Sequence, residues 1–184
     1  MKRTLLCLLG LCALLCVASC GSRNVIHEQT RESRRLEAQG AYDVAKLEVT
    51  FKPHQDWEVT EEEWSIWVTG WRGDYKKELM SECYKEMHFI DAAGTATRPV
   101  VTCEIYEMDK GGSFGVGGAG FARANVKIVD PKSGEVWYDG KLEGKGSSGV
   151  FETATAQGRF KFSVLSLARQ IADLMETGSP RKPD

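Results

Sequence analysis

The sequence predicts an α+β domain, with a mixed or antiparallel sheet of about four strands and two main helices packed on one face. Several segments alternate apolar and polar residues, the period expected of half-buried strands. The segments 64–83 and 160–175 instead repeat apolar residues at helical spacing. Along the chain these segments follow the order β-α-β-β-β-α, which favours helices and strands that share one core.

Residues 1–19 have the parts of a bacterial export signal. Lys2 and Arg3 give a positive start, and the leucine-rich run that follows is shorter than the roughly 20 apolar residues needed to cross a bilayer. The run ends in Val17-Ala18-Ser19-Cys20, which resembles a lipobox. We therefore expect a cleaved signal peptide and an acylated Cys20. The alternatives are an uncleaved anchor and an ordinary secretory signal.

Acylation of Cys20 would attach the protein to a membrane essentially permanently, since each buried CH₂ contributes about 0.8 kcal/mol. By resemblance to proteobacterial lipoproteins, an aspartate after the cysteine would imply retention in the inner membrane. The residue here is Gly21, which favours the outer membrane, facing the periplasm. Loss of Lys2 and Arg3 takes the net charge from −2 to −4. That charge gives no basic field, so we expect no nucleic acid partner.

The remaining chain predicts one domain. The segment 20–41 is polar, with few apolar residues, and is expected to be the lipidated cysteine and a flexible tether. The single α/β domain is expected over 42–177 and a loose tail over 178–184.

The first half of the domain begins with alternating residues over 46–51, which predict a strand. Thr60 and Glu63 have the spacing of a capping box, so a helix is expected to follow. Its apolar residues fall near one face: Trp64, Trp67, Val68, Trp71, Tyr75, Leu79 and Cys83. Gly70 and Gly73 support an alternative, a strand over 64–69 followed by a helix over 74–87.

In the second half, alternation predicts strands over 101–106, 122–128 and 135–142. The last two form a hairpin, because Asp130-Pro131-Lys132-Ser133-Gly134 between them is typical of a turn. The apolar stripe from Phe160 to Met175 predicts the final helix. Gly178 and Pro180 end it.

Two cysteines of the mature domain, Cys83 and Cys103, are not lipidated. The periplasm is oxidising, so they form either a disulfide or a pair of buried thiols that pack as small apolar side chains.

A glycine-rich stretch matches the spacing of a dinucleotide fingerprint through Gly115, Gly117, Gly118 and Gly120. That site needs a helix to open at the third glycine, whereas a strand is expected here. The stretch therefore predicts a glycine-rich loop or strand and no cofactor. Ser113 matches a nucleophile-elbow pattern, but every histidine precedes it in the chain, so no catalytic site is expected. No metal-ligand spacing is present.

Four of the five tryptophans, Trp57, Trp64, Trp67 and Trp71, lie within 15 residues. They either pack in the core or, if exposed on one side, form a partner surface of Trp64, Trp67 and Trp71.

Three features together resemble an uncharacterised family of bacterial lipoproteins, known only as a domain of unknown function: the Gly115–Gly120 stretch, the Asp130–Gly134 turn and the carboxy-terminal amphipathic helix. The resemblance covers roughly residues 42–177 and implies docking to another envelope protein. We therefore expect an adaptor domain that is not an enzyme. The alternative is a module that binds a small molecule or glycan.

Overall fold

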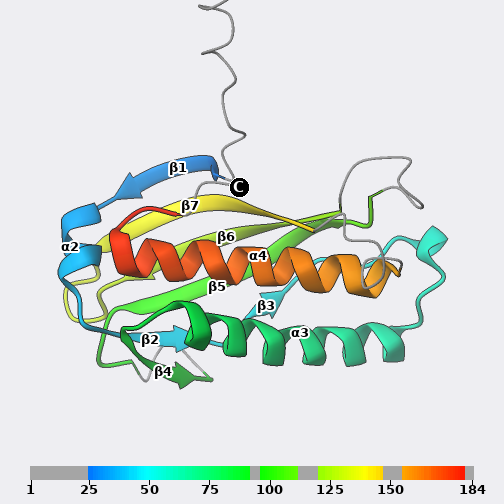
Figure 1. The fold of residues 1–184 in the computed structure, drawn as a ribbon, viewed down its shortest axis with the longest axis horizontal. Helices are drawn as coiled ribbons and strands as arrows, with labels where there is room; N and C mark the ends of the chain where they lie inside the picture. Colours follow the sequence, from blue (N-terminus) through cyan, green and yellow to red (C-terminus); the bar gives the residue numbers. More distant parts are fainter. Residues whose placement is uncertain (1–24, 92–95, 112–119, 147–154, 181–184) are drawn as a thin grey trace, which may run out of the picture.

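The computed structural model describes residues 25–91, 96–111, 120–146 and 155–180 (Figure 1). These residues form a seven-stranded mixed sheet and three α-helices. The strand order is β1-β7-β6-β5-β2-β4, with β3 also paired to β5. The α+β class is confirmed. The expected four strands are too few, because β1, β2 and β4 were not predicted.

One half of the sheet is parallel. The strand β2 (Ala41–Ala45) lies between β4 (Glu86–Ile90) and β5 (Val100–Asp109) and is parallel to both. The helix α3 (Glu61–Glu82) connects β2 to β4 on the helical side of the sheet, after the short strand β3 (Glu48–Val49) and a 3₁₀ turn at Gln55–Trp57. Only β3 remains of the strand predicted over 46–51.

The other half is antiparallel and matches the predictions closely. The strands β5, β6 (Phe121–Val129) and β7 (Val136–Lys145) pair in sequence. At the β6–β7 turn the Asp130 carboxylate accepts hydrogen bonds from the Lys132 N–H at 3.0 Å and the Ser133 hydroxyl at 2.9 Å, which lowers the pKa of Asp130. Gly134 closes the turn with a φ of +71°.

The helix α3 is continuous from Glu61 to Glu82, so the alternative strand over 64–69 is wrong. The predicted capping box is present: the Glu63 N–H donates to the Thr60 hydroxyl, and the Thr60 N–H donates to the Glu63 carboxylate. The end at residue 87, given by the alternative helix over 74–87, is also wrong, because the chain from Glu86 onward pairs with β2.

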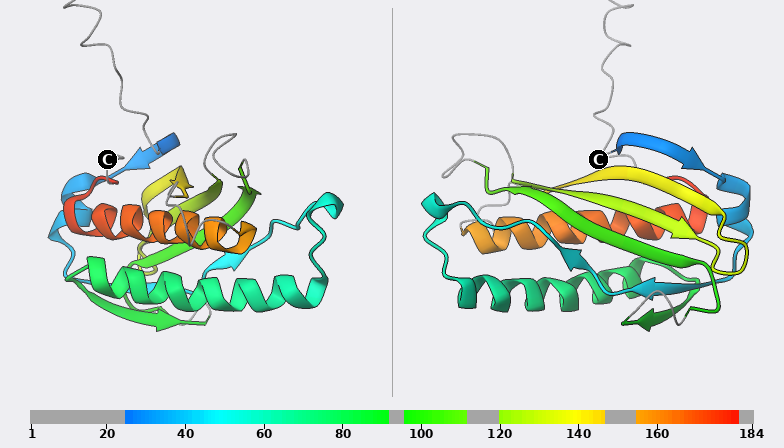
Figure 2. Two further views of the ribbon diagram at one scale, coloured as in Figure 1. Left: turned by 45° about the vertical axis from the view of Figure 1, so that its right-hand side comes forward. Right: turned by 180° about the vertical axis from the view of Figure 1, so that it is seen from behind.

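The helix α4 (Ala156–Thr177) confirms the final prediction and ends at Gly178, which has a left-handed conformation. The helices α3 and α4 lie side by side on one face of the sheet and run in the same direction (Figures 1 and 2). Ion pairs join the two helices: Asp74 of α3 with Lys161 of α4, at 3.5 Å, and Glu78 of α3 with Arg169 of α4.

The segment expected to be a flexible tether is folded from residue 25 onward. The strand β1 (Val25–Arg31) pairs with β7 at the edge of the sheet, with two register irregularities. The helix α2 (Ser33–Ala38) follows and buries Leu36 completely. The prediction failed because one buried leucine in a charged sequence gives almost no periodic signal. Residues 20–24 lie outside the described part of the chain.

The tail predicted from residue 178 also begins later than expected. The Ser33 hydroxyl donates to the Gly178 carbonyl at 2.9 Å, and Arg31 donates to the Ser179 hydroxyl at 3.2 Å. Pro180 is buried. The chain is therefore held against β1 and α2 up to Pro180, and residues 181–184 lie outside the described part.

Candidate functional site

The helix α3 has two faces of different composition. Its inner face buries Trp71, Tyr75 and Leu79 against the sheet and α4. The opposite face carries a line of residues that we call the α3 outer stripe: Ile66, Gly70, Gly73, Lys77 and Met80. Their spacing of four and three residues places them in one row along the helix.

The α3 outer stripe exposes two large apolar side chains to solvent. Ile66 is 61% exposed and Met80 is 51% exposed, and Tyr84, just beyond the end of the helix, is 94% exposed. These are three of the five large apolar side chains that are exposed in the described part of the chain. Ile66 and Met80 lie about 21 Å apart along the helix, so each is a separate apolar contact point on this face.

Gly70 and Gly73 open the middle of this stripe. A Cβ atom at either position would meet nothing within 4 Å, and neither glycine is among those with positive φ. Each costs roughly 1 kcal/mol of helix stability relative to alanine. The packing within the described domain therefore gives no reason for a glycine at either position.

The tryptophans form an aromatic cluster on the inner side of α3, with Phe51 and Phe160. The rings of Trp64 and Trp71 are 5.2 Å apart, and those of Trp71 and Phe160 are 5.8 Å apart. Trp71 is only 2% exposed, and Trp64 and Trp67 are half-buried. The expectation of an exposed Trp64/Trp67/Trp71 face is therefore wrong for Trp71, and the cluster mainly joins α3 to α4.

A groove of about 360 Å³ lies beside the cluster, between α3 and α4. Trp67, Trp71 and Phe162 give it aromatic walls, and Asp74 and Lys161 place an ion pair across it. Its remaining lining residues are Gly70, Thr155, Gln157 and Gly158. Its volume and its mixture of aromatic and polar groups fit a small ligand.

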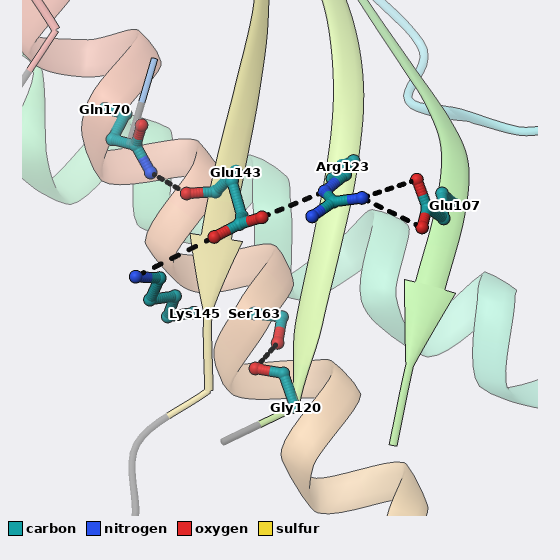
Figure 3. A network of polar contacts seen from close by, with 7 residues as sticks. All are labelled: Glu107, Gly120, Arg123, Glu143, Lys145, Ser163 and Gln170. Carbon is teal, nitrogen blue, oxygen red and sulfur yellow. Dashed lines mark hydrogen bonds and ion pairs between the residues drawn. The ribbon is translucent and has the colours of Figure 1, made fainter. Parts of the chain in front are cut away.

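The sheet face opposite the helices carries charged side chains that pair across strands (Figure 3). Arg123 donates to both carboxylate oxygens of Glu107 at 3.0 Å and to Glu143 at 2.9 Å, and Lys145 lies 3.8 Å from Glu143. These hydrogen bonds raise the pKa of Arg123. The group is balanced in charge, so we assign it to sheet stability.

Of the four glycines singled out in the sequence, only Gly120 lies in the described part of the chain. Its carbonyl accepts from the Gly146 N–H at 2.7 Å and the Ser163 hydroxyl at 3.3 Å (Figure 3). A Cβ at this position would lie 2.9 Å from the Asp109 carbonyl oxygen. Gly120 thus permits close packing where β6 begins. Gly115, Gly117 and Gly118 lie outside the described residues.

Cys83 and Cys103 are buried free thiols, so the disulfide alternative is wrong for this structure. Burial raises the pKa of Cys83 to about 11 and that of Cys103 to about 12. Such thiols are poor nucleophiles.

Within the described ranges, no three His, Cys, Asp or Glu side chains gather as a metal site. No helix there is long and apolar enough to cross a membrane. The predicted lipidation site, Cys20, lies outside these ranges.

Sequence reasoning missed the α3 outer stripe. Its signal was present as the seven-residue spacing of Ile66, Gly73 and Met80, but the tryptophans on the other face dominated the interpretation of this segment.

No protein-family model and no curated protein matches the chain. Among solved structures, it is similar to PelC from Paraburkholderia phytofirmans, a dodecamer, with 11% identity, a TM-score of 0.48, and 84% of this chain and 96% of that chain covered. It is also similar to the hypothetical protein CT253 from Chlamydia trachomatis, with 14% identity, a TM-score of 0.45, and coverage of 77% and 98%. A third is XCC0632 from Xanthomonas campestris, of family DUF330, with 8% identity, a TM-score of 0.45, and coverage of 74% and 83%. Similarities this distant transfer no function to this chain.

Proposed function

We propose that this chain is a lipoprotein anchored through Cys20, on the periplasmic side of the outer membrane, and that it binds another envelope protein. The α3 outer stripe is the contact surface in this proposal. The observation that carries it is the row of exposed Ile66 and Met80 with two unpacked glycines between them. The anchor rests on the lipobox that ends at Cys20. The proposal assigns no catalytic step to the chain.

The stripe suits a helix of the partner. Helices pack at axis separations of about 8–10 Å, and small side chains at the crossing point allow the closer approaches. Gly70 and Gly73 offer that crossing point, and Ile66 and Met80 lie on either side of it. Fully burying an apolar side chain of this size contributes roughly 1.5–3 kcal/mol, and Ile66 and Met80, at 61% and 51% exposed, have a little over half of that surface left to bury.

The test uses the full-length protein in its native envelope. A photoreactive amino acid replaces Ile66 or Met80, and Lys132, exposed in the β6–β7 turn, is the matched control position. We expect one and the same protein to be crosslinked from positions 66 and 80 and not from position 132. Crosslinking of the same protein from all three positions would contradict the assignment of the surface.

A second variant separates binding from folding. The double substitution Gly70→Ala/Gly73→Ala should stabilise the free domain, because alanine favours helix and meets no neighbour. The same variant should lose most of the crosslink, because the added methyl groups keep the partner helix away. Ser65→Ala, exposed on the same helix but off the stripe, is the control. An unchanged crosslink in the double variant would refute the proposed docking mode.

A second candidate function is supported by the groove between α3 and α4. A sugar ring has apolar C–H faces and hydroxyl groups at its rim, which match the aromatic walls and the Asp74–Lys161 pair. The probe is the disaccharide of N-acetylglucosamine and N-acetylmuramic acid. It should raise the melting temperature of the mature protein, and the increase should disappear in Lys161→Met. No increase with this probe would count against glycan binding.

A further inference from the structure

We infer that the β1 edge of the domain faces the membrane surface, so that the sheet stands on edge and α3 lies on the side away from the lipid. The partner of this edge is the headgroup layer of the bilayer in which the acyl chains are embedded. The inference rests on the proposed acylation of Cys20 and adds an orientation to it.

The first argument is the length of chain between the anchor and the fold. Five residue steps separate Cys20 from Val25, the first residue of β1. An extended chain spans at most about 3.6 Å per residue, so Val25 lies within about 18 Å of the lipidated residue. Val25 is fixed to the domain, since it pairs with Leu142 of β7. The anchor therefore has too little chain to reach around the molecule.

The second argument is the width of the sheet. The order β1-β7-β6-β5-β2-β4 puts β1 at one edge and β4 at the other. Five spacings of about 4.8 Å separate them by about 24 Å. Figures 1 and 2 show β1 on one side of the molecule and α3 with β4 on the opposite side. An orientation with β4 toward the lipid would need a longer connection than the sequence provides.

The third argument concerns the chemistry of this edge. Ile26, close to the anchor, is 46% exposed and offers an apolar side chain to the interface. The segment from Val25 to Ala38 carries three Arg and three Glu, and Arg31 is paired with Glu28. Its charges balance, so attraction to anionic lipid contributes little. The short connection sets the orientation, and salt should leave it unchanged.

This orientation fits the proposed docking surface. The α3 outer stripe belongs to the helix farthest from β1, where the periplasmic part of a partner has access to it. A surface beside β1 would instead be restricted by the bilayer.

The experiment uses purified, acylated protein in vesicles of phosphatidylethanolamine and phosphatidylglycerol. Single cysteines are introduced at exposed positions on opposite edges, Gln29→Cys on β1 and His88→Cys on β4, and carry a fluorescent label. The native Cys83 and Cys103 are buried, so labelling is selective for the new thiol. Nitroxide-labelled lipid headgroups quench fluorophores that lie near the membrane surface.

We expect several-fold stronger quenching at position 29 than at position 88, in low and high salt alike. Inserting twenty Gly/Ser residues after Gly21 should reduce this difference, because the flexible connection then reaches about 25–30 Å. Equal quenching at both positions, or stronger quenching at position 88, in protein whose Cys20 is acylated by mass spectrometry overturns the orientation. Absence of acylation on Cys20 overturns the proposed anchor itself, so the two failures are distinguishable.

Discussion

A substitution at Gly144 of β7 tests how closely α4 packs on the sheet. A Cβ atom built there would lie 2.1 Å from the Ser163 carbonyl oxygen and 2.8 Å from the Leu167 Cγ. The oxygen belongs to the backbone of α4, so no change of rotamer relieves the contact. Gly144→Ala must therefore displace α4 from β7.

The expected cost follows from that displacement. Adding a methyl group to a well-packed core typically costs 1–3 kcal/mol, and a clash with helix backbone belongs at the upper end, about 3 kcal/mol. For a chain of this length each kcal/mol lowers the melting temperature by about 2–4 °C, so a fall of about 6–12 °C is expected. Gly70→Ala is the matched control, since its Cβ meets nothing, and it should raise stability by about 1 kcal/mol.

Thermal and urea denaturation of residues 21–184, followed by circular dichroism, measures both variants. A loss of stability in Gly144→Ala together with a gain in Gly70→Ala would support the close contact between β7 and α4. A Gly144→Ala variant as stable as the parent would refute it, and with it the position of α4 on the sheet.

Three further predictions follow from buried groups. Leu36→Ala should destabilise the domain by about 2–5 kcal/mol in urea denaturation, because Leu36 is fully buried; a negligible loss would mean that α2 is not part of the fold. Burial raises the pKa of Cys103 to about 12, against 9.0 for a free thiol. The neutral thiol therefore contributes fully to the free energy of unfolding below pH 9, and this contribution is lost as the pH rises toward 12. The stability of Cys103→Ala should accordingly fall less steeply than that of the parent over this range, and equal slopes would contradict the burial. Lys85 donates to the carbonyls of Leu36, Glu37 and Met175, so Lys85→Met should cost about 1–3 kcal/mol, measured in the same way, whereas an unchanged midpoint would contradict these bonds.

The elements that the sequence predicted well are those whose residues follow one period over a long stretch. In β6, Ala122, Ala124, Val126 and Ile128 are all fully buried, as their alternation requires. The capping box at Thr60 and the helix end at Gly178 were also predicted correctly, because each depends only on local hydrogen bonds or on the backbone freedom of glycine.

The missed elements depend on contacts distant in sequence. In β2 the buried Asp43 interrupts the apolar pattern. Its carboxylate accepts from the Thr97 and Arg98 N–H groups, at 2.8 and 3.0 Å, more than fifty residues away. Such a partner cannot be inferred from the residues around Asp43. The strand β1 is similar, because an edge strand with polar residues has no period to detect.

The candidate site was less predictable than the fold. In the sequence, Gly70 and Gly73 supported a strand over 64–69, whereas the structure places both inside the continuous helix α3. Their position opposite the buried face becomes visible only when Trp71 and Tyr75 are seen to define that face. A helix face that packs against nothing in the domain can be recognised only after the structure shows which face is buried.

The two register irregularities in β1 bear on how the open edge of the sheet behaves toward a second copy of the chain. An edge strand presents unpaired N–H and C=O groups, so two molecules that meet edge to edge can pair through it. A regular edge would then recruit the next copy and grow into an aggregate. The shifts between Val25 and His27 and between Glu28 and Thr30 break the spacing of the edge within seven residues. They favour separate molecules over a sheet that continues from one copy to the next.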